Sequence, residues 1–209
     1  MKVVIFGSTG TIGKHLIEQS LEKGHQVLAF CRNAEKLNAF SNPNLKIKEG
    51  DVFNLDDVSS AIKGQEVVII TLGSGSKKSI VRSQGTKNII TAMNNNGVNR
   101  LICQSTLGTY ESEENLNFFW KYIMFGWFLK QVFIDHELQE HYVKNSHLDW
   151  TIVRPGAFTN GEKTERYKHG FSSKTKSLKL KISRADVADF ILKQVTDTYY
   201  LHKTPGLSY

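Results

Sequence analysis

The stretch Val3-Val4-Ile5-Phe6-Gly7-Ser8-Thr9-Gly10-Thr11-Ile12-Gly13 decides how the chain is interpreted. Its four apolar residues predict a buried parallel strand, and the glycine pattern GxxGxxG opens a helix expected over 12–24. Gly7 permits a tight turn, Gly10 lets the backbone approach a pyrophosphate, and Gly13 lets the helix pack close to the strand. In this context we favour a dinucleotide site over a purely structural turn. The predicted cofactor-binding residues here are Gly7, Ser8, Thr9, Gly10, Thr11, Ile12 and Gly13.

Beyond this stretch, short runs rich in Val and Ile alternate with segments of helical period. Strands are predicted at 3–6, 27–31, 46–48, 67–71, 101–105 and 151–153, and helices at 12–24, 33–39, 55–63, 79–96, 118–145 and 184–196. This alternation predicts an α/β fold, a Rossmann-like doubly wound parallel sheet with helices on both faces, in strand order 3-2-1-4-5-6. We expect a single domain, 1–209, with substrate-side elements at about 107–135 and 157–183.

The composition excludes collagen-like, low-complexity and disordered classes, because 40% of the 209 residues are hydrophobic and only three are proline. The 27 basic and 20 acidic residues leave a net charge of +7. Such an excess fits nucleic acid, an anionic membrane or a phosphate-bearing ligand. No nucleic-acid motif is present, so we expect no nucleic-acid partner.

Two further features concern the compartment and the assembly. Cys31 and Cys103 are the only cysteines, and each falls in a predicted buried strand, which favours a reduced, cytoplasmic protein over a disulfide framework. The apolar segment 118–134 contains Lys121 and Lys130 and is too short to span a bilayer, so we expect no stable membrane insertion. A monomer or weak homodimer is expected.

Charged residues near the second strand point to the kind of dinucleotide. An NAD site places an acidic residue at the end of that strand, whereas this chain has Arg32, with Lys36 one helical turn further on. Both suit a 2′-phosphate, so NADP(H) is predicted over NAD(H). The alternative is that both are solvated surface charges.

Small and acidic residues follow the third and fourth strands at the same edge. Asp51 and Val52 follow the third strand, where a carboxylate can accept from the adenine amino group. Leu72 and Gly73 follow the fourth and leave room for the cofactor. Such residues are also common in ordinary turns. The prediction that they bind the cofactor therefore rests on their common position at one edge of the sheet.

Several motifs resemble the atypical, NmrA-like short-chain dehydrogenase/reductases, in the branch of biliverdin-IXβ reductase and bacterial NADH-flavin reductases. They are Gly7–Gly13, Gly50–Val52, Gly85–Ile89, Asp135-His136 with Gln139-Glu140, Leu148–Gly156 and Ile182–Phe190. The resemblance implies NAD(P)H as hydride donor and a planar conjugated acceptor, a flavin such as FMN or FAD, or a bilin. It also implies that His136 lines the cofactor site, and we add Pro155 of its Arg-Pro-Gly motif. Ala157 replaces a histidine of the bilin reductase, which favours flavin over bilin.

The absence of a catalytic Tyr/Lys pair from the sequence argues against one class of reaction, the interconversion of alcohols and ketones. Ordinary dehydrogenases of this superfamily use a Tyr with a Lys four residues later, and no plausible tyrosine here has that partner. A flavin or quinone acceptor needs no such pair, because its ring delocalises the charge that arrives with the hydride. We therefore predict an NADPH-dependent oxidoreductase. The alternative is a non-catalytic NADP sensor that regulates a partner.

Three residues are candidates for catalysis. Ser105 and Thr106 end the fifth strand, where a hydroxyl could bind the carboxamide or the substrate, or simply cap the next loop. His136 shares a helix face with Glu140, which could orient it towards the cofactor or form a surface ion pair. The spacing of the seven histidines predicts no metal site.

Two segments have open interpretations. The aromatics of 118–133 pack a helix on the sheet, wall a planar substrate, or do both, and membrane contact or self-association is a further alternative. From Lys163 to Arg184 there are eight basic residues and one acid, Glu165. They form either a solvated face or a rim that attracts phosphorylated substrates such as FMN.

Overall fold

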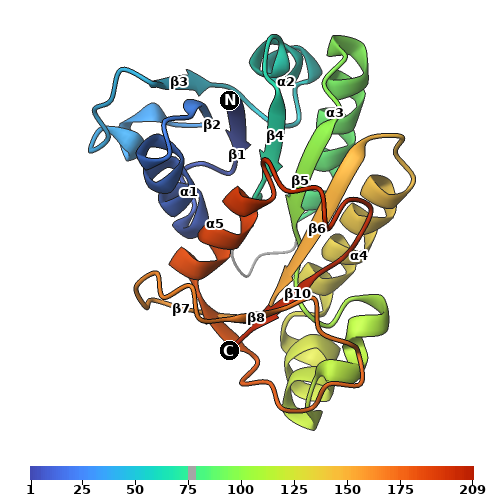
Figure 1. Cartoon of the computed structure of the whole chain (residues 1–209). Helices are drawn as coiled ribbons and strands as arrows, with labels where there is room; N and C mark the ends of the chain where they lie inside the picture. Colours follow the sequence, from blue (N-terminus) through green and yellow to red (C-terminus); the bar gives the residue numbers. More distant parts are fainter. Residues whose placement is uncertain (75–78) are drawn as a thin grey trace.

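The computed structural model describes residues 1–74 and 79–209, and an eight-stranded sheet runs through it (Figure 1). The strand order is β3-β2-β1-β4-β5-β6-β10-β8, which confirms the predicted order of the first six. All neighbours are parallel except β10 and β8. The strands are β1 (Lys2–Phe6), β2 (Gln26–Cys31), β3 (Leu45–Glu49), β4 (Val67–Ile70), β5 (Arg100–Gln104), β6 (Asp149–Pro155), β8 (Lys168–His169) and β10 (Gly206–Ser208).

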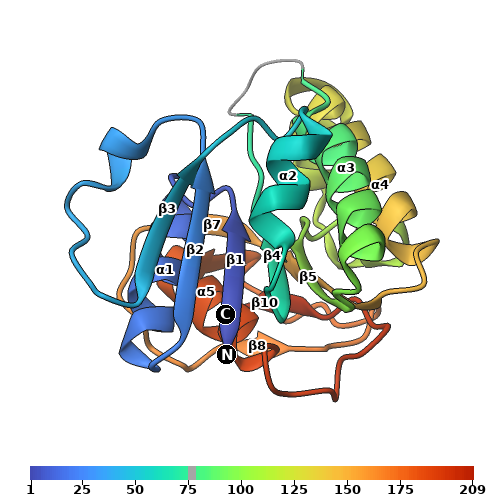
Figure 2. The ribbon, with the colours of Figure 1, turned by 90° about the horizontal axis from the view of Figure 1, so that it is seen from above.

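Helices cover both faces of this sheet (Figure 2). One face carries α1 (Thr11–Glu22) and α5 (Arg184–Lys193), and the other carries α2 (Leu55–Ile62), α3 (Val81–Asn96) and α4 (Lys130–Lys144). Strand side chains alternate between two cores, so Val3 and Ile5 pack with α1 while Val4 and Phe6 pack with α2 and α3. The fold class predicted from the sequence is confirmed.

Local sequence explains where the helices begin and end. Asn54 accepts hydrogen bonds from the amides of Asp56 and Asp57 and so caps α2. Ser183 accepts from the amide of Asp186 and caps α5. Gly97, with φ of 67°, ends α3 in the left-handed conformation that glycine adopts most easily.

The predicted helices at 33–39 and 118–145 differ from the structure. The first is only a 3₁₀ turn, η1 (Ala34–Leu37). The second is divided at Leu129 into a π-helix, η3 (Phe119–Phe128), and α4. Aromatic residues at seven of the eleven positions of 118–128 hide the period of the segment, which is why the sequence predicted one uninterrupted helix.

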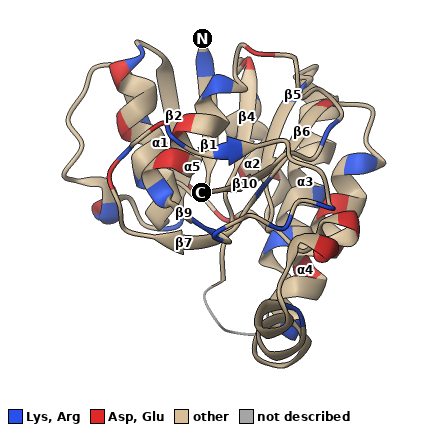
Figure 3. Cartoon of the chain, turned by 60° about the horizontal axis from the view of Figure 1, so that its bottom comes forward, with Lys and Arg blue, Asp and Glu red and all other residues tan. Residues whose placement is uncertain are grey.

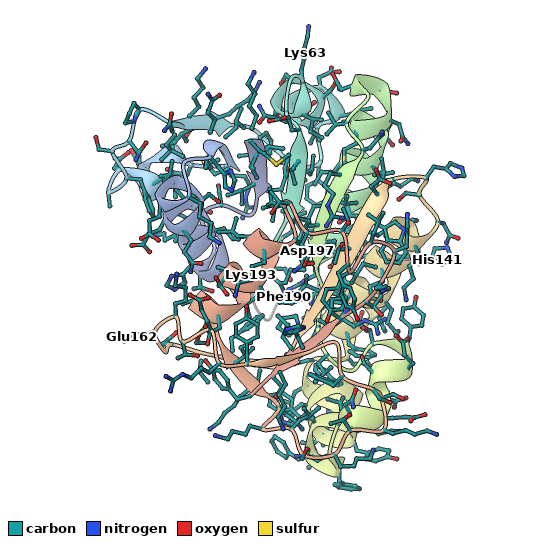
Figure 4. All side chains as sticks on the ribbon, viewed as in Figure 1. Lys63, His141, Glu162, Phe190, Lys193 and Asp197 are labelled. Atoms are coloured by element: carbon teal, nitrogen blue, oxygen red, sulfur yellow. The ribbon has the colours of Figure 1, made fainter. Side chains whose placement is uncertain are left out.

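The segment 157–183 forms structure that the sequence did not predict. β7 (Ala157–Thr159) and β9 (Lys181–Ser183) make a separate two-stranded parallel sheet, and β8 lies between them in the chain. α5 anchors this segment, since Lys193 contacts Glu165 at 3.2 Å and Phe190 packs on Tyr167 and His169. Figure 4 shows Phe190 and Lys193 on α5 and Glu162 at the outer edge of the segment.

Candidate functional site

A first cavity of about 450 Å³ lies at the carboxyl ends of β1, β2, β4 and β5. In parallel sheets of this topology, ligands bind at that edge, where the strand order reverses. The glycine loop after β1 forms one side, and the ends of β2 and β3 form another. Among the residues that line it are Gly7, Thr9, Gly10, Thr11, Ile12, Arg32, Gly50, Asp51, Val52, Leu72, Gly73, Arg82, Gln104, His136 and Phe158.

The glycine loop has the geometry that a dinucleotide needs. Gly7 has φ of 91°, and a Cβ there would lie 2.4 Å from the Thr71 carbonyl oxygen. A Cβ on Gly13 would lie 2.2 Å from the Gly7 carbonyl oxygen, so α1 packs against the loop only with glycine at that position. None of the described side chains caps α1 at Gly10, and Gly10, Thr11 and Ile12 at the start of the helix line the cavity. These features fit the pyrophosphate of a dinucleotide.

Most of the predicted cofactor residues line this cavity, and four do not. The exceptions are Ser8, Gly13, Lys36 and Pro155. The Ser8 hydroxyl is buried and donates to the Phe30 carbonyl at 2.8 Å, so it joins the loop to β2. Of the two predicted phosphate-binding cations, Arg32 lines the cavity, whereas Lys36 is exposed on η1 outside it. Asp51 accepts from the amide of Phe53 at 3.0 Å and so also orders its own turn.

A second cavity of about 380 Å³ adjoins the first. Arg82, Gln104, His136 and Phe158 line both, so the two cavities meet at these four side chains. The wall of the second cavity is mainly apolar. It includes Leu107, Leu116, Trp120, Met124, Phe125, Leu129, Val132, Phe133, Ala157 and Leu180. Such a shape and lining suit a flat apolar molecule placed beside the end of a dinucleotide.

The η3 segment forms only part of this wall. Trp120, Met124 and Phe125 line the second cavity, and no residue of η3 is fully buried. Most of its other side chains are exposed, among them Trp127 at 79% and Phe128 at 70%. Of the two interpretations of the aromatic segment, the cavity wall agrees with the structure better than packing on the sheet. No helix within residues 1–74 and 79–209 is long and apolar enough to cross a bilayer.

His136 lies at the boundary between the two cavities and is only 6% exposed. Burial, reinforced by the positive charge of Arg82, lowers the pKa of His136 to about 3. The imidazole is therefore neutral at physiological pH. It can donate or accept a hydrogen bond there, but it is not a reservoir of imidazolium protons.

Of the two alternatives for His136 and Glu140, the surface ion pair does not agree with the structure. Both side chains are buried, and the Glu140 carboxylate binds Arg154 through two hydrogen bonds of 2.9 and 2.7 Å. Thr109 also donates to it at 2.7 Å. A buried carboxylate needs such partners, and Arg154 on β6 supplies a fork that matches its geometry. Glu140 is thus part of the scaffold behind the site.

The two hydroxyl candidates after β5 have different environments. Ser105 is buried and lines the second cavity, and its Oγ has no partner among the described residues. Thr106 also lines that cavity, but its hydroxyl lies 3.3 Å from the Leu107 carbonyl, a local contact of the kind offered as the alternative. Ser105 is therefore the better placed of the two to meet a ligand.

Sequence reasoning missed Arg82, Gln104 as a separate candidate, and Phe158. Arg82 is the second residue of α3, and its role depends on Asp135, which lies 53 positions further along the chain. The Asp135 carboxylate accepts from the amides of Arg82 and Ser83 at 3.1 and 3.0 Å and so caps α3. The Asp135-His136 motif was the signal that could have located this junction, because one residue caps α3 while the next lines both cavities.

Known proteins share the fold, and they also identify the family. A model of the NAD(P)H-binding family matches residues 7–198. The chain belongs to this family. The match covers the glycine loop, both cavities and α5, so the family's defining ligand agrees with the geometry of the first cavity.

Similar proteins occur in eukaryotes and in bacteria. UPF0659 protein YMR090W of Saccharomyces cerevisiae is 26% identical over an alignment of 205 residues, which covers 93% of this chain and 87% of the yeast protein. An uncharacterized chloroplastic protein of Arabidopsis thaliana is 29% identical over 78% of this chain, which corresponds to 61% of the plant protein. The solved oxidoreductase ylbE of Lactococcus lactis has a TM-score of 0.84 and 26% identity, covering 100% of this chain and 90% of that one.

Two more distant structures share the fold. ChuY of Escherichia coli O157:H7, described as an anaerobilin reductase, has a TM-score of 0.82 and 21% identity, with 100% of this chain and 97% of that chain covered. A short-chain dehydrogenase/reductase of Veillonella parvula solved with NADP has a TM-score of 0.83 and 17% identity, with 100% and 94% covered. At these identities the likeness concerns the fold alone.

Proposed function

We propose that this protein is an NADPH-dependent reductase that transfers hydride to a planar conjugated acceptor, with a flavin as the first candidate. The observation that carries the proposal is the meeting of the two cavities at Arg82, Gln104, His136 and Phe158. A nicotinamide that reaches this boundary supplies hydride directly to a ring in the second cavity. The chain's part is to hold the two rings in register and to exclude water from between them.

The lining of the cavities supports this class of acceptor. None of the described residues that line either cavity is a tyrosine or a lysine, so the usual proton-donating pair of ketone reductases is missing from the site. His136 is held neutral, so it does not replace that pair as a strong acid. Acceptors that delocalise charge over a conjugated ring need no proton at the moment of transfer. Arg32 at the mouth of the first cavity supports the preference for NADPH over NADH.

The test is an anaerobic assay of NADPH oxidation, followed at its absorbance band, with FMN, FAD, biliverdin and quinones as separate acceptors. We expect turnover with at least one acceptor and a slower reaction with NADH. Tight NADPH binding without turnover of any acceptor would instead support a cofactor-binding sensor.

A pair of variants connects the activity to the second cavity. Ala157 lines that cavity, so Ala157→Phe should reduce kcat/KM for the acceptor at least about tenfold by filling it, while the Kd for NADPH changes less than about twofold. Ala39→Phe introduces the same side chain at an exposed position that lines neither cavity. Equal effects of both substitutions would contradict the assignment of the acceptor to the second cavity.

A further inference from the structure

Arg82 occupies a special position in the site. It is only 7% exposed, yet it lines both cavities together with the neutral His136. Arg32 lines only the first cavity and Arg184 only the second. Among the described residues, Arg82 is therefore the one cationic side chain shared by both.

Asp135 fixes Arg82 without closing a tight ion pair around its guanidinium. The carboxylate oxygens accept from the amides of Arg82 and Ser83, and the Ser83 hydroxyl donates to Oδ1 at 2.5 Å. The nearest guanidinium nitrogen, Nη1, lies 3.5 Å from Asp135 Oδ2 and donates instead to the Ser74 hydroxyl at 2.9 Å. The Asp135 carboxylate thus lies closer to the backbone amides at the start of α3 than to the guanidinium of Arg82.

The guanidinium has further hydrogen-bond donors, on Nε and Nη2, that could bind a ligand. Arg82 Nε has no partner among the described residues. Nη2 lies 3.9 Å from the position that a Cβ would take on Gly73, which lines the first cavity. An arginine that is buried and has few partners acts strongly on any charge that develops beside it. Burial lowers the pKa of Arg82 and Asp135 opposes this, and an arginine remains charged in either case.

We infer that Arg82 stabilises the negative charge that an acceptor gains in the second cavity, which selects acceptors whose two-electron-reduced form is an anion. The inference rests on the proposed reductase function and names the residue and the substrate class that go with it. Flavins and quinones belong to this class. Arg82 would act as a preorganised positive charge, with no proton transferred to or from it.

The chemistry of the transfer explains why a cation is needed there. A C–H bond of the reduced nicotinamide breaks, and its electron pair moves with the hydrogen to a ring atom of the acceptor, N5 in a flavin, where a new bond to hydrogen forms. The nicotinamide is oxidised to its cation, and the acceptor gains two electrons and one hydrogen, hence one negative charge. Solvent later supplies the proton that neutralises the reduced acceptor.

The test compares Arg82→Gln and Arg82→Lys with the matched control Arg166→Gln, at an exposed arginine that lines neither cavity. The probe is lumiflavin, which carries the reactive ring system without a phosphate. In single-turnover experiments we expect R82Q to slow hydride transfer by about 10²-fold, the effect of removing one preorganised donor. R82K should retain more of the rate, and R166Q should stay within about twofold of the unmodified protein.

A second readout needs no turnover. The Kd of oxidised and of chemically reduced lumiflavin is measured anaerobically in the presence of NADP⁺. We expect the unmodified protein, R82K and R166Q to favour the reduced, anionic ring, and R82Q to lose about tenfold of that preference. The Kd for NADPH and the circular dichroism spectrum identify variants that fail to fold.

The outcomes separate this inference from the proposed function. If the unmodified protein reduces an acceptor while folded R82Q keeps both the rate and the preference within about twofold, the role of Arg82 is overturned and the reductase proposal stands. If R82Q does not fold, R82K decides, because loss of the preference in a folded protein that keeps the charge overturns the inference. Absence of turnover with every acceptor overturns the reductase proposal itself.

Discussion

Arg32 and Lys36 are four positions apart, yet Arg32 lines the first cavity and Lys36 lies exposed outside it. The sequence places both near the adenosine end of the site, but only Arg32 lines the first cavity. The chain turns into η1 after Asn33, whose side chain accepts from the amide of Glu35 at 2.8 Å, and this cap directs Lys36 away from the cavity. The proposed preference for the 2′-phosphate therefore depends on Arg32.

We expect Arg32→Glu to weaken NADPH binding by about tenfold or more, because a charge-assisted hydrogen bond to the 2′-phosphate is worth about 1.5 kcal/mol. Binding of NADH should change much less. Lys36→Glu makes the same charge change outside the cavity and should alter the Kd for NADPH less than about threefold. Fluorescence titration with both cofactors measures this. Equal losses for NADPH and NADH would argue against contact with the 2′-phosphate.

The site residues predicted from the sequence are recognisable from their neighbours in the chain, whereas the residues that were not predicted depend on contacts with distant segments. Gly7, Gly10 and Gly13 are recognisable because strand, turn and helix follow one another within a dozen residues. Arg82 carries no such signal, since its environment is made by Asp135 on another helix and by Ser74 after β4. The alternative of a surface ion pair between His136 and Glu140 fails for the same reason, because Arg154 is visible as a partner of Glu140 only after α4 packs beside β6.

The contact of Arg154 with Glu140 joins three elements behind the site. Arg154 on β6 binds Glu140 on α4 and Glu111 on η2 (Tyr110–Asn115), and Lys144 lies 3.1 Å from the same Glu140 carboxylate. Burial, the largest single influence, raises the pKa of Glu140. The hydrogen bonds and charge of Arg154, together with the Thr109 hydrogen bond and the charge of Lys144, outweigh burial, so the net pKa is lowered. Removing one charge from such a buried pair leaves the other without compensation.

Glu140→Gln should therefore reduce the free energy of unfolding at pH 7 by about 3 to 5 kcal/mol. Because the folded pKa of Glu140 lies below its unfolded value, its ionised form stabilises the fold above about pH 4.5 and loses that effect as the pH falls through the folded pKa. The difference between the two proteins should shrink below about pH 4.5. Urea unfolding across this range measures it, and a difference independent of pH would contradict the assignment.

The strands were easier to predict than the segments that form the second cavity. β1, β2, β4 and β5 are apolar runs buried on both faces, which their composition shows directly. β7, β8, β9 and β10 have only two or three residues each and include Lys, His, Gly and Ser. Such short strands are defined by tertiary partners such as β6 and Tyr209, whose hydroxyl donates to Asp186 at 2.6 Å.

For the chain as a whole, the first cavity spans strands on both sides of β1. Its lining comes from the ends of β1, β2 and β3 and from the ends of β4 and β5. A dinucleotide bound there contacts both halves of the sheet at once, so binding is linked to global folding. The charges are mixed over much of the surface, and Figure 3 shows basic residues beside β7 and β9 and acidic residues on and near α4.

NADPH at 100 times its Kd should stabilise the folded chain by about 2.7 kcal/mol. For a protein of this size the melting temperature should rise by about 6 to 10 °C. Differential scanning fluorimetry with NADPH, NADH and free phosphate measures the effect. The R32E variant should show a smaller rise with NADPH at the same concentration, and an equal rise with phosphate alone would mean that a simple anion site accounts for the binding.

The η3 segment has an evolutionary consequence. It supplies part of the second cavity's wall but contributes no residue to either hydrophobic core. Substitutions in these ten residues can reshape the pocket while leaving the packing of the sheet and its helices intact. Substitutions in η3 should therefore lower the free energy of unfolding less than substitutions in the hydrophobic cores do. Proteins that share this fold can then diverge in the molecules they accept without first gaining stability.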